Sequence, residues 1–445
     1  MNYSLDWLMA NDGFECACGK RHYGLLKDCV IKKDALLYLP EMIRKHHGTH
    51  PFILCDTLTY EAAGERVTKL LESENIPYTI HIIQRIHPAP DEKIVGEALM
   101  YCDEKCDIVV AVGGGVINDT CKIIAAAKKV ADIYVATAPS MDGFASGSSS
   151  MERGGLKVSL NSKCPDVVIG DAEILAHAPT HMIRSGIGDM VAKYVSLVEW
   201  QIAALLLGEY YCPTIAQIVR ASLDVCVKVA KDAVNGDYDA VCKLTEGLVM
   251  SGLAMNYAGI SRPASGMEHY ISHIIDMRAL EFGTPADLHG IQCGMATLLT
   301  VQAYEMLTKL TPDSEKALKY VNEFSLDAWF DHLRAQLGHG AEAMIAGEQK
   351  EKKYDKAKHA ERLEKILANW DEILRIAGEL PSAAELYDFF ESIGHPVSGK
   401  SFGLTEEELR EAFLMAKDIR DKYVIGRMLW DFGVLEEFAN KIVIH

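Results

Sequence analysis

The 445-residue sequence lacks the features that would place it in a membrane or on nucleic acid. No uninterrupted apolar run reaches the roughly 20 residues of a membrane-spanning helix, although 49% of the residues are hydrophobic. Lys and Arg total 45 against 63 Asp and Glu, and the net charge of −18 argues against general affinity for nucleic acid or anionic membranes. The first residues have neither the basic nor the apolar region of a secretory signal, and the twelve cysteines are scattered, many in apolar segments. We therefore expect a cytoplasmic protein with reduced thiols and no stable membrane insertion.

Strand-like and helix-like segments alternate in the first part of the chain. Short apolar runs predict strands at 51–55, 78–83, 107–112, 131–137 and 167–170. Helical patterns lie between the first four of these runs, at 60–71, 92–100 and 118–129. This rhythm predicts an α/β domain at 1–178 with a parallel sheet covered on both faces. The Ser- and Gly-rich segment 139–164 predicts loops or a hairpin, and a helical domain is expected at 179–445.

The stretch 262–294 carries three histidines at spacings that metal binding can explain. His269 and His273 lie four residues apart, on one face of a predicted helix, and His289 begins a second apolar helix after a turn. Upstream, Asp189 follows two glycines and is expected to open another apolar helix. One Asp and two His suit a borderline cation such as Zn²⁺, Ni²⁺ or Fe²⁺, with positions left open for substrate. The alternative is three unrelated histidines and a carboxylate that serves only a helix start.

A glycine-rich turn follows the clearest predicted strand. Gly113, Gly114 and Gly115 precede a helix, so the phosphates of a ligand can approach backbone N–H groups at a helix N-terminus. The GxGxxG fingerprint is absent, and a triple glycine is also typical of a tight turn. A second loop, 137–146, follows the next strand, and Asp56 ends an earlier one. Both loops lie at carboxyl ends of strands and Asp56 can bond a ribose, which together favour a dinucleotide and NADH over NADPH.

Two further segments have weaker signals. Cys16, Cys18 and His22 lie close enough in the chain to hold a zinc ion, but no fourth ligand is visible nearby, and a polar turn explains them equally well. The densely charged segment 342–362 predicts a solvated helix or helical insertion without chemistry of its own.

Five motifs in order resemble the glycerol-1-phosphate dehydrogenase family, in particular its bacterial branch. They are GGGVIND (113–119), TAPSMDGFAS (137–146), GIGDMVAK (186–193), SGMEHYISH (265–273) and HGIQCG (289–294). This family is part of a superfamily with iron-containing alcohol dehydrogenases, glycerol dehydrogenases and dehydroquinate synthases. The resemblance implies a Rossmann-like N-terminal domain, a helical C-terminal domain in a dehydroquinate synthase-like fold, and an active site in the cleft between them. It also implies NAD(P)H-dependent interconversion of dihydroxyacetone phosphate and sn-glycerol 1-phosphate with one divalent metal, zinc or nickel.

The resemblance also implies roles for individual residues. The metal ligands would be Asp189, His269 and His289, and Asp142, His273 and Asp189 would be catalytic. The expected cofactor-binding residues are Asp56, Gly115, Val116, Ile117, Asn118, Asp119, Thr137, Ala138, Pro139, Ser140 and Ser146. Val116 departs from the pattern because many relatives have Ser there, which removes one hydroxyl contact. The interval between His269 and His289 is a few residues longer than in archaeal relatives.

The implied reaction needs a Lewis acid at the carbonyl oxygen, and His273 is the expected proton donor because of its helical spacing from His269. Lys157, Lys163 and Arg262 are candidates for the substrate phosphate, although each is also an ordinary cation. The expected partner is a small phosphorylated triol or ketone, and the apolar helical surface favours a homodimer. The competing functions are a glycerol or polyol dehydrogenase, a dehydroquinate synthase-like lyase, and a non-catalytic nucleotide-binding protein.

Overall fold

The computed structural model describes residues 3–10, 13–85, 88–154 and 156–442. Contacts divide the chain into two compact units, the first with residues 1–190 and 214–261 and the second with 191–213 and 262–445. The first unit therefore includes α8 (Thr180–Val191) and α11 (Tyr238–Ala258), which lie after the predicted boundary at 178/179. That boundary stays a prediction.

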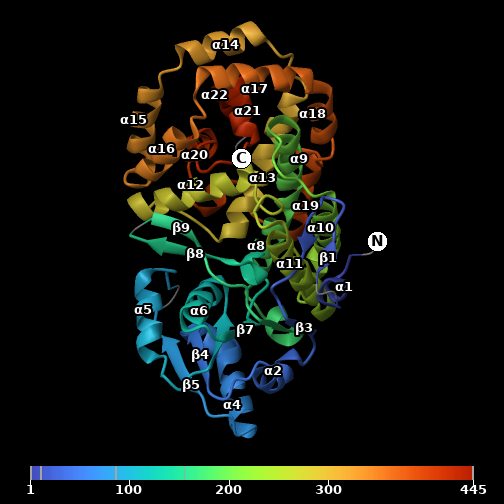
Figure 1. The fold of residues 1–445 in the computed structure, drawn as a ribbon, viewed down its shortest axis with the longest axis vertical. Helices are drawn as coiled ribbons and strands as arrows, with labels where there is room; N and C mark the ends of the chain where they lie inside the picture. The colour runs from blue at the N-terminus through green and yellow to red at the C-terminus, as the bar shows by residue number, and fades with distance from the viewer. Residues whose placement is uncertain (1–2, 11–12, 86–87, 155, 443–445) are drawn as a thin grey trace. The chain divides into compact units, whose positions relative to one another are not determined.

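A six-stranded sheet forms the centre of the first unit (Figure 1). Its strands are β3 (Asp28–Lys32), β4 (Pro51–Asp56), β5 (Thr79–Ile83), β6 (Ile108–Gly113), β7 (Ala131–Ala136) and β10 (Val167–Asp171). They are ordered β3-β10-β7-β6-β4-β5, and every neighbouring pair is parallel. This confirms the predicted α/β class and all five predicted strands. The edge strand β3 was missed because its apolar run is only three residues long, Cys29 to Ile31, and none of its side chains is fully buried.

Side chains on the two faces of the sheet pack against different helices. On one face, Ile108, Val110 and Val112 share a buried cluster with Ile43 and Val67, which come from helices α2 (Leu39–Lys45) and α4 (Glu65–Ser73). Helix α6 (Gly115–Lys128) packs along β6 and β4. Because strand side chains alternate between faces, a sheet covered in this way needs the continuously apolar runs seen in β4 and β6.

Smaller elements complete the first unit. Two antiparallel hairpins pair β1 (Phe14–Glu15) with β2 (Arg21–His22) and β8 (Ser148–Arg153) with β9 (Leu156–Asn161). The second of these is the hairpin predicted in 139–164. The remaining helices are α1 (Leu5–Ala10), α3 (Thr57–Thr59), α5 (Glu92–Tyr101), α7 (Ala172–Ala176) and α10 (Pro213–Val234), with a π-helical turn at Tyr60–Gly64 between α3 and α4.

The second unit is helical throughout its described residues. Its helices are α9 (Lys193–Leu207), α12 (Met267–Phe282), α13 (His289–Leu307), α14 (Ser314–Glu323), α15 (Leu326–Leu337), α16 (Gly340–Glu351), α17 (Lys356–Ala368), α18 (Trp370–Ala377), α19 (Ala383–Ile393), α20 (Glu406–Ala416), α21 (Ile425–Asp431) and α22 (Leu435–Lys441). One large apolar cluster joins most of them, with Tyr270, Ile274 and Leu299 among its members. The sequence-based expectation of a mostly helical second part is confirmed.

The charged segment 342–362 spans two helices, α16 and α17, and is not wholly solvated as predicted. Glu348 and His359 are buried. Glu348 pairs with Lys353 at 2.6 Å and with Arg427 at 3.3 Å, and the Asp431 carbonyl oxygen lies 2.8 Å from the His359 ring. One face of the charged segment 342–362 is therefore buried in the second unit. The Glu348 carboxylate can be buried there because Lys353 and Arg427 balance its charge.

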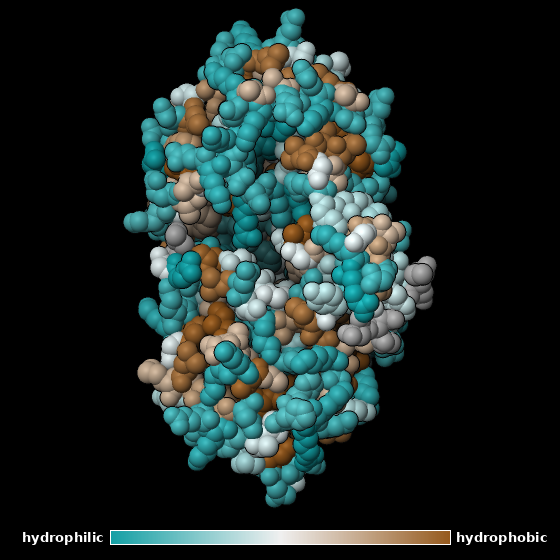
Figure 2. Space-filling view, viewed as in Figure 1, coloured by the Kyte–Doolittle hydropathy of each residue, from teal (hydrophilic) through white to brown (hydrophobic). Residues whose placement is uncertain are grey.

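One helical stretch, 180–207, is long and apolar enough to cross a membrane by length and composition alone. In its most apolar window 72% of the residues are buried inside the protein, as in the core helix of a globular fold. On the face shown in Figure 2, hydrophilic residues predominate and hydrophobic residues form separate patches.

Candidate metal centre and cofactor-binding turn

Helices α12 and α13 pack together in the second unit and bring the predicted histidines close to one another. The ring centroids of His269 and His289 are 5.0 Å apart, with the ring planes at 70°. The His273 ring is 5.9 Å from that of His289 and nearly parallel to it. His269 is buried, whereas His273 and His289 are partly exposed. The i,i+4 spacing on α12 and the position of His289 at the start of α13 are both as predicted.

Two buried carboxylates hold the start of α12. The backbone N–H of Gly266 donates to Oε1 of Glu268 at 2.7 Å, and that of Met267 donates to Oε2 of Glu199 at 2.9 Å. These bonds satisfy amides that have no partner within the helix. A Cβ at position 266 would lie 2.5 Å from Oε2 of Glu199, so only glycine fits there. Burial, and then the neighbouring charge of Glu268, raise the pKa of Glu199 to about 8.

The same Glu268 also orients His269. Its Oε1 lies 2.7 Å from Nδ1 of His269, and the carboxylate is fully buried. A carboxylate beside one ring nitrogen favours a proton there and leaves the lone pair on the other nitrogen, Nε2. The sequence analysis did not predict a role for Glu268. The signal in the sequence is a carboxylate directly before the candidate ligand His269.

Cys293 is a second residue that the sequence reasoning missed. Its Sγ lies 3.6 Å from Nε2 of His289, four residues earlier on α13. Burial alone would raise the pKa of the Cys293 thiol, but the adjacent His269 and His289 together bring it below its ordinary value. One ligand atom each from His269, His289 and Cys293 lies within 4.8 Å of the others. The signal in the sequence is the i,i+4 spacing in HGIQC, the same spacing that pointed to His269 and His273.

Asp189 lies in the last turn of α8, in the first unit, so the prediction that it opens a helix is wrong. Gly186 and Gly188 are inside this helix rather than in a flexible entry to it. Oδ2 of Asp189 accepts the N–H of Asp142 at 2.9 Å. Asp189 is followed closely in the chain by α9, which belongs to the second unit. Within that unit, Oγ of Ser196 on α9 donates to the carbonyl oxygen of Pro263 at 3.0 Å, a few residues before α12 begins. That Asp189 shares one metal with His269 and His289 stays a prediction.

The second predicted loop, 137–146, is held against α8 and α11 within the first unit. A Cβ at Gly186 would lie 2.0 Å from the carbonyl oxygen of Pro139, and one at Gly252 would lie 2.8 Å from that of Asp142. Oγ of Ser251 donates to Oδ2 of Asp142 at 2.8 Å. The helical glycines therefore allow the close approach that fixes this loop, and Ser251 fixes the Asp142 carboxylate.

The glycine-rich turn lies between β6 and α6, as predicted. A Cβ at Gly113 would lie 2.7 Å from the side chain of Ile117, which explains the glycine that ends the strand. At Gly114, the N-cap residue, the nearest side-chain atom would be 3.7 Å away, so the backbone there can be approached closely. The turn thus fits a phosphate group at a helix N-terminus.

Two of the predicted cofactor residues have side chains directed into the protein. Nδ2 of Asn118 donates to the carbonyl oxygen of Phe144 at 3.3 Å, and Asp119 pairs with Lys122 at 3.1 Å. Nζ of Lys122 also donates to the carbonyl oxygen of Gly143 at 2.8 Å. These contacts hold the second loop in place. That Asn118 and Asp119 bind a cofactor stays a prediction.

Asp56 ends β4, where the sequence placed it, and has a structural task as well. It is the N-cap of the next helix, and its Oδ1 accepts the N–H of Thr59 at 2.8 Å. Its side chain is partly exposed, so the second carboxylate oxygen can still face a ribose.

Two of the three phosphate candidates already have anionic partners. Lys163 pairs with Asp132 at 2.9 Å and with Asp166 at 2.5 Å. Arg262 is buried and donates to both carboxylate oxygens of Glu209, at 2.8 and 2.6 Å. Their charges are therefore balanced within the protein, which argues against the predicted phosphate role. Lys157 lies on β9 and is partly buried.

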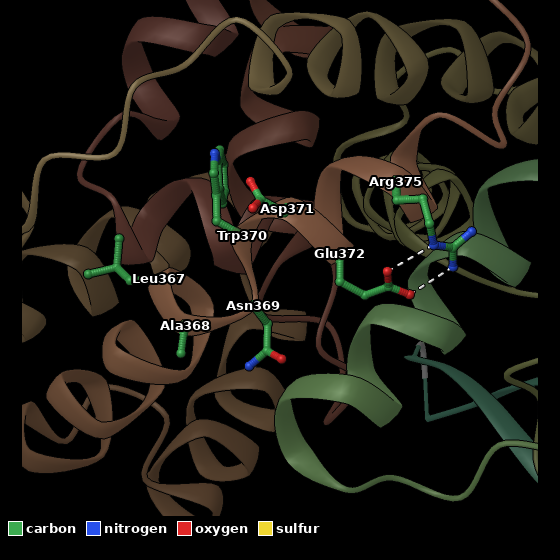
Figure 3. Close-up of a pocket in the computed structure, with 7 residues that line it drawn as sticks. All are labelled: Leu367, Ala368, Asn369, Trp370, Asp371, Glu372 and Arg375. Atoms are coloured by element: carbon green, nitrogen blue, oxygen red, sulfur yellow. Dashed lines mark hydrogen bonds and ion pairs between the residues drawn. The ribbon is translucent and has the colours of Figure 1, made fainter.

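A surface depression of about 500 Å³ lies at the junction of α17 and α18 (Figure 3). Its lining residues are Leu367, Ala368, Asn369, Trp370, Asp371, Glu372 and Arg375. The guanidinium of Arg375 points to Glu372 and donates to both of its carboxylate oxygens, at 2.9 and 2.8 Å. None of the predicted site residues lines this depression, and we assign no chemistry to it.

Comparison with known proteins supports one family. Residues 30–179 match the family model described as iron-containing alcohol dehydrogenase. The chain is 29% identical to glycerol-1-phosphate dehydrogenase [NAD(P)+] of Bacillus licheniformis, over 96% of this chain and 94% of that protein. It is 32% identical to the enzyme of the same name from Geobacillus stearothermophilus, over 72% of this chain and 80% of that protein.

Among solved structures, glycerol dehydrogenase from Schizosaccharomyces pombe superposes with a TM-score of 0.60. The match covers 95% of this chain and 92% of that one at 14% identity, and it supports the fold alone. The fold and the sequence relatives agree with the resemblance carried by the five motifs. This chain is a member of the glycerol-1-phosphate dehydrogenase family.

Proposed function

We propose that this protein is a metal-dependent, NAD(P)-linked oxidoreductase that interconverts dihydroxyacetone phosphate and sn-glycerol 1-phosphate. The observation that carries the proposal is the 32% identity to a glycerol-1-phosphate dehydrogenase over 80% of that enzyme's length. Two predicted parts support the proposal. The histidine pair on α12 and α13 would provide metal ligands, and the glycine-rich turn before α6 would bind the phosphates of the cofactor.

The proposed metal ligands are Asp189, His269 and His289, a set of three that leaves positions open for substrate. The Cys293 thiol lies beside the two histidines in the second unit. The proposed set fits a borderline divalent ion such as Zn²⁺ or Ni²⁺, because imidazole and carboxylate both bind such ions. Support comes from Glu268, which fixes the tautomer of His269 in the form that binds metals. When bound, the ion supplies Lewis-acid polarisation of a carbonyl oxygen.

Two further side chains would contact the substrate. Asp142 would accept a hydrogen bond from a substrate hydroxyl, because its carboxylate is buried and is held in place by the Ser251 hydroxyl at 2.8 Å. His273 would hold or release the proton exchanged with the substrate oxygen, because its ring is partly exposed and stacked near His289. Asp189 would position Asp142, since its carboxylate accepts the Asp142 N–H.

The cofactor would lie against the turn 113–115 and the loop 137–146. Backbone N–H groups at the start of α6 suit a pyrophosphate, and Asp56 would bond the adenosine ribose. The negative charge of Asp56 repels a 2′-phosphate, so NADH is the proposed preferred cofactor. We also propose a cytoplasmic homodimer, as the sequence suggests.

The test supplies purified, metal-loaded protein with dihydroxyacetone phosphate and NADH, and identifies the product enantiomer. We expect sn-glycerol 1-phosphate, with little oxidation of unphosphorylated glycerol in the reverse direction. Production of the opposite enantiomer, or faster turnover of glycerol, would reject the assignment. His269→Ala should lose the metal that supports turnover and the activity together, and a fully active variant would contradict the ligand assignment.

A further inference from the structure

The N-terminal hairpin brings together Cys16, Cys18 and His22, a group that the proposed reaction does not use. Strands β1 and β2 pair antiparallel, with Phe14 opposite His22. Between them the N–H of Gly19 donates to the carbonyl oxygen of Cys16 at 3.0 Å, and Gly19 has a φ of +83°. This tight turn places Sγ of Cys18 at 3.2 Å from Nε2 of His22.

His22 is oriented as a metal-binding histidine would be. It is buried, and its Nδ1 lies 2.8 Å from the carbonyl oxygen of Tyr257 on α11. A carbonyl oxygen only accepts hydrogen bonds, so Nδ1 must carry the proton and Nε2 keeps its lone pair. That lone pair is on the side of Cys18, and a backbone carbonyl behind the ring is the usual support of a metal-bound imidazole.

Cys212, at the end of the segment 191–213 of the second unit, is the candidate for a fourth ligand because the chain links it directly to the first unit. Sγ of Cys16 lies 3.4 Å from Oγ1 of Thr214, near the start of α10 in the first unit. Cys212 is two residues before Thr214, so chain connectivity alone keeps its thiol near the hairpin. One ligand atom from each of Cys16, Cys18 and His22, all in the first unit, lies within 4.8 Å of the others.

We propose that Cys16, Cys18, His22 and Cys212 bind one Zn²⁺ ion in a closed structural site. Three thiolates and one imidazole complete a tetrahedron, and zinc–sulfur bonds of about 2.3 Å place the ligand atoms about 3.8 Å apart. Sγ of Cys18 and Nε2 of His22, 3.2 Å apart, are already close to that spacing. On binding, the three thiols release their protons to solvent, and His22 would bind the ion through Nε2.

The chemistry of this group separates it from the proposed catalytic metal. A set of four protein ligands leaves no position for substrate, which is the distinction between structural and catalytic zinc. The twelve cysteines form no disulfide bond in the part of the chain that the structure describes, so the three thiols remain able to bind metal. The ion would fasten the short hairpin, which has only two residue pairs, to the start of α10.

The test compares zinc content of the full chain purified without chelators. We expect Cys18→Ser to bind one zinc ion fewer per chain than the wild type. The control, Cys102→Ser, alters another partly exposed cysteine and should keep the wild-type content. A difference of one ion supports the site whether or not the catalytic group retains its own metal, so a failure here is distinct from a failure of the proposed function.

A second measurement covers the case in which Cys18→Ser does not fold. Zinc-edge X-ray absorption of the wild-type protein should show sulfur neighbours at about 2.3 Å in the ratio expected for three thiolates and one imidazole. Equal zinc content in Cys18→Ser and Cys102→Ser, a zinc spectrum without that sulfur shell, or a Cys16–Cys18 disulfide found by mass spectrometry would each overturn the proposal.

Discussion

Replacement of Glu268 by Gln tests whether this buried carboxylate prepares His269 to bind a metal. Gln has the same size, and its amide oxygen can still accept the N–H of Gly266, but the negative charge beside Nδ1 of His269 is lost. Loss of such a partner typically weakens metal binding 10- to 100-fold, or about 1.4 to 2.8 kcal/mol. We therefore expect the free metal concentration for half-maximal activity to rise by about that factor.

The same substitution should not lower the stability of the metal-free protein. Glu268 lies close to Glu199, and its charge is the largest cause after burial of the raised pKa of Glu199. Removal of one charge from two neighbouring buried carboxylates relieves repulsion. A merely structural role of Glu268 would give the opposite result, with a lower unfolding temperature and unchanged metal affinity.

The assay uses metal-stripped enzyme in a metal buffer, with activity measured against free Ni²⁺ or Zn²⁺. Activity reports only the ion that supports turnover, so metal bound elsewhere does not interfere. Glu199→Gln is the matched control, because Glu199 is equally buried but accepts the N–H of Met267 rather than facing the imidazole. The reasoning is refuted if Glu268→Gln needs no more metal than the wild type, or if the control shows the same loss.

Three other substitutions test separate parts of the first unit. Gly186→Ala should lower stability by about 3 kcal/mol or more and reduce cofactor affinity, because its Cβ would lie 2.0 Å from the Pro139 carbonyl oxygen; normal thermal unfolding would contradict this close packing. Asp56→Asn keeps the helix cap but removes the charge, so the NADPH-to-NADH ratio of kcat/KM should rise about tenfold, and an unchanged ratio would exclude Asp56 from the ribose site. Burial opposes the ionisation of Asp166, but hydrogen bonds from Lys163 and Lys27 outweigh it and hold its pKa below the ordinary value. Ionised Asp166 therefore stabilises the fold above about pH 4 and loses this effect as the pH falls through its lowered pKa. Asp166→Asn should cost about 2 kcal/mol in urea unfolding at pH 7, with a difference that shrinks below about pH 4, whereas a pH-independent difference would contradict the charge argument.

Periodicity predicted the elements that are strongly apolar and failed where pairing partners lie far away in the chain. Strand β6 was evident because all six of its residues are buried. Strand β3 was not, since its place at the edge of the sheet depends on pairing with β10 about 140 residues later. Asp189 was assigned to a helix start because of its two glycines, whereas both glycines lie inside α8, where Gly186 allows the close approach of the Pro139 carbonyl oxygen.

In the candidate metal site, too, only local patterns were visible in the sequence. The four-residue spacing of His269 and His273 predicted that both lie on one face of a helix, and the turn before His289 predicted that this residue begins the next helix. Cys293 has the same spacing from His289, but a buried thiol has no distinctive pattern, and only its distance of 3.6 Å from that ring singles it out.

The amino-acid sequence by itself determined the parallel α/β class of the first part, the helical second part, the glycine-rich turn and the family, since each depends on local periodicity or on contiguous motifs. Only the tertiary structure decided which charged side chains are paired with one another. Lys163 and Arg262 are bound to carboxylates, and Glu268 faces His269. It also decided that Thr214, 198 residues after Cys16 in the chain, lies 3.4 Å from the Cys16 thiol. Such pairings depend on distances in space between segments remote in the chain, and no local pattern of residues encodes them.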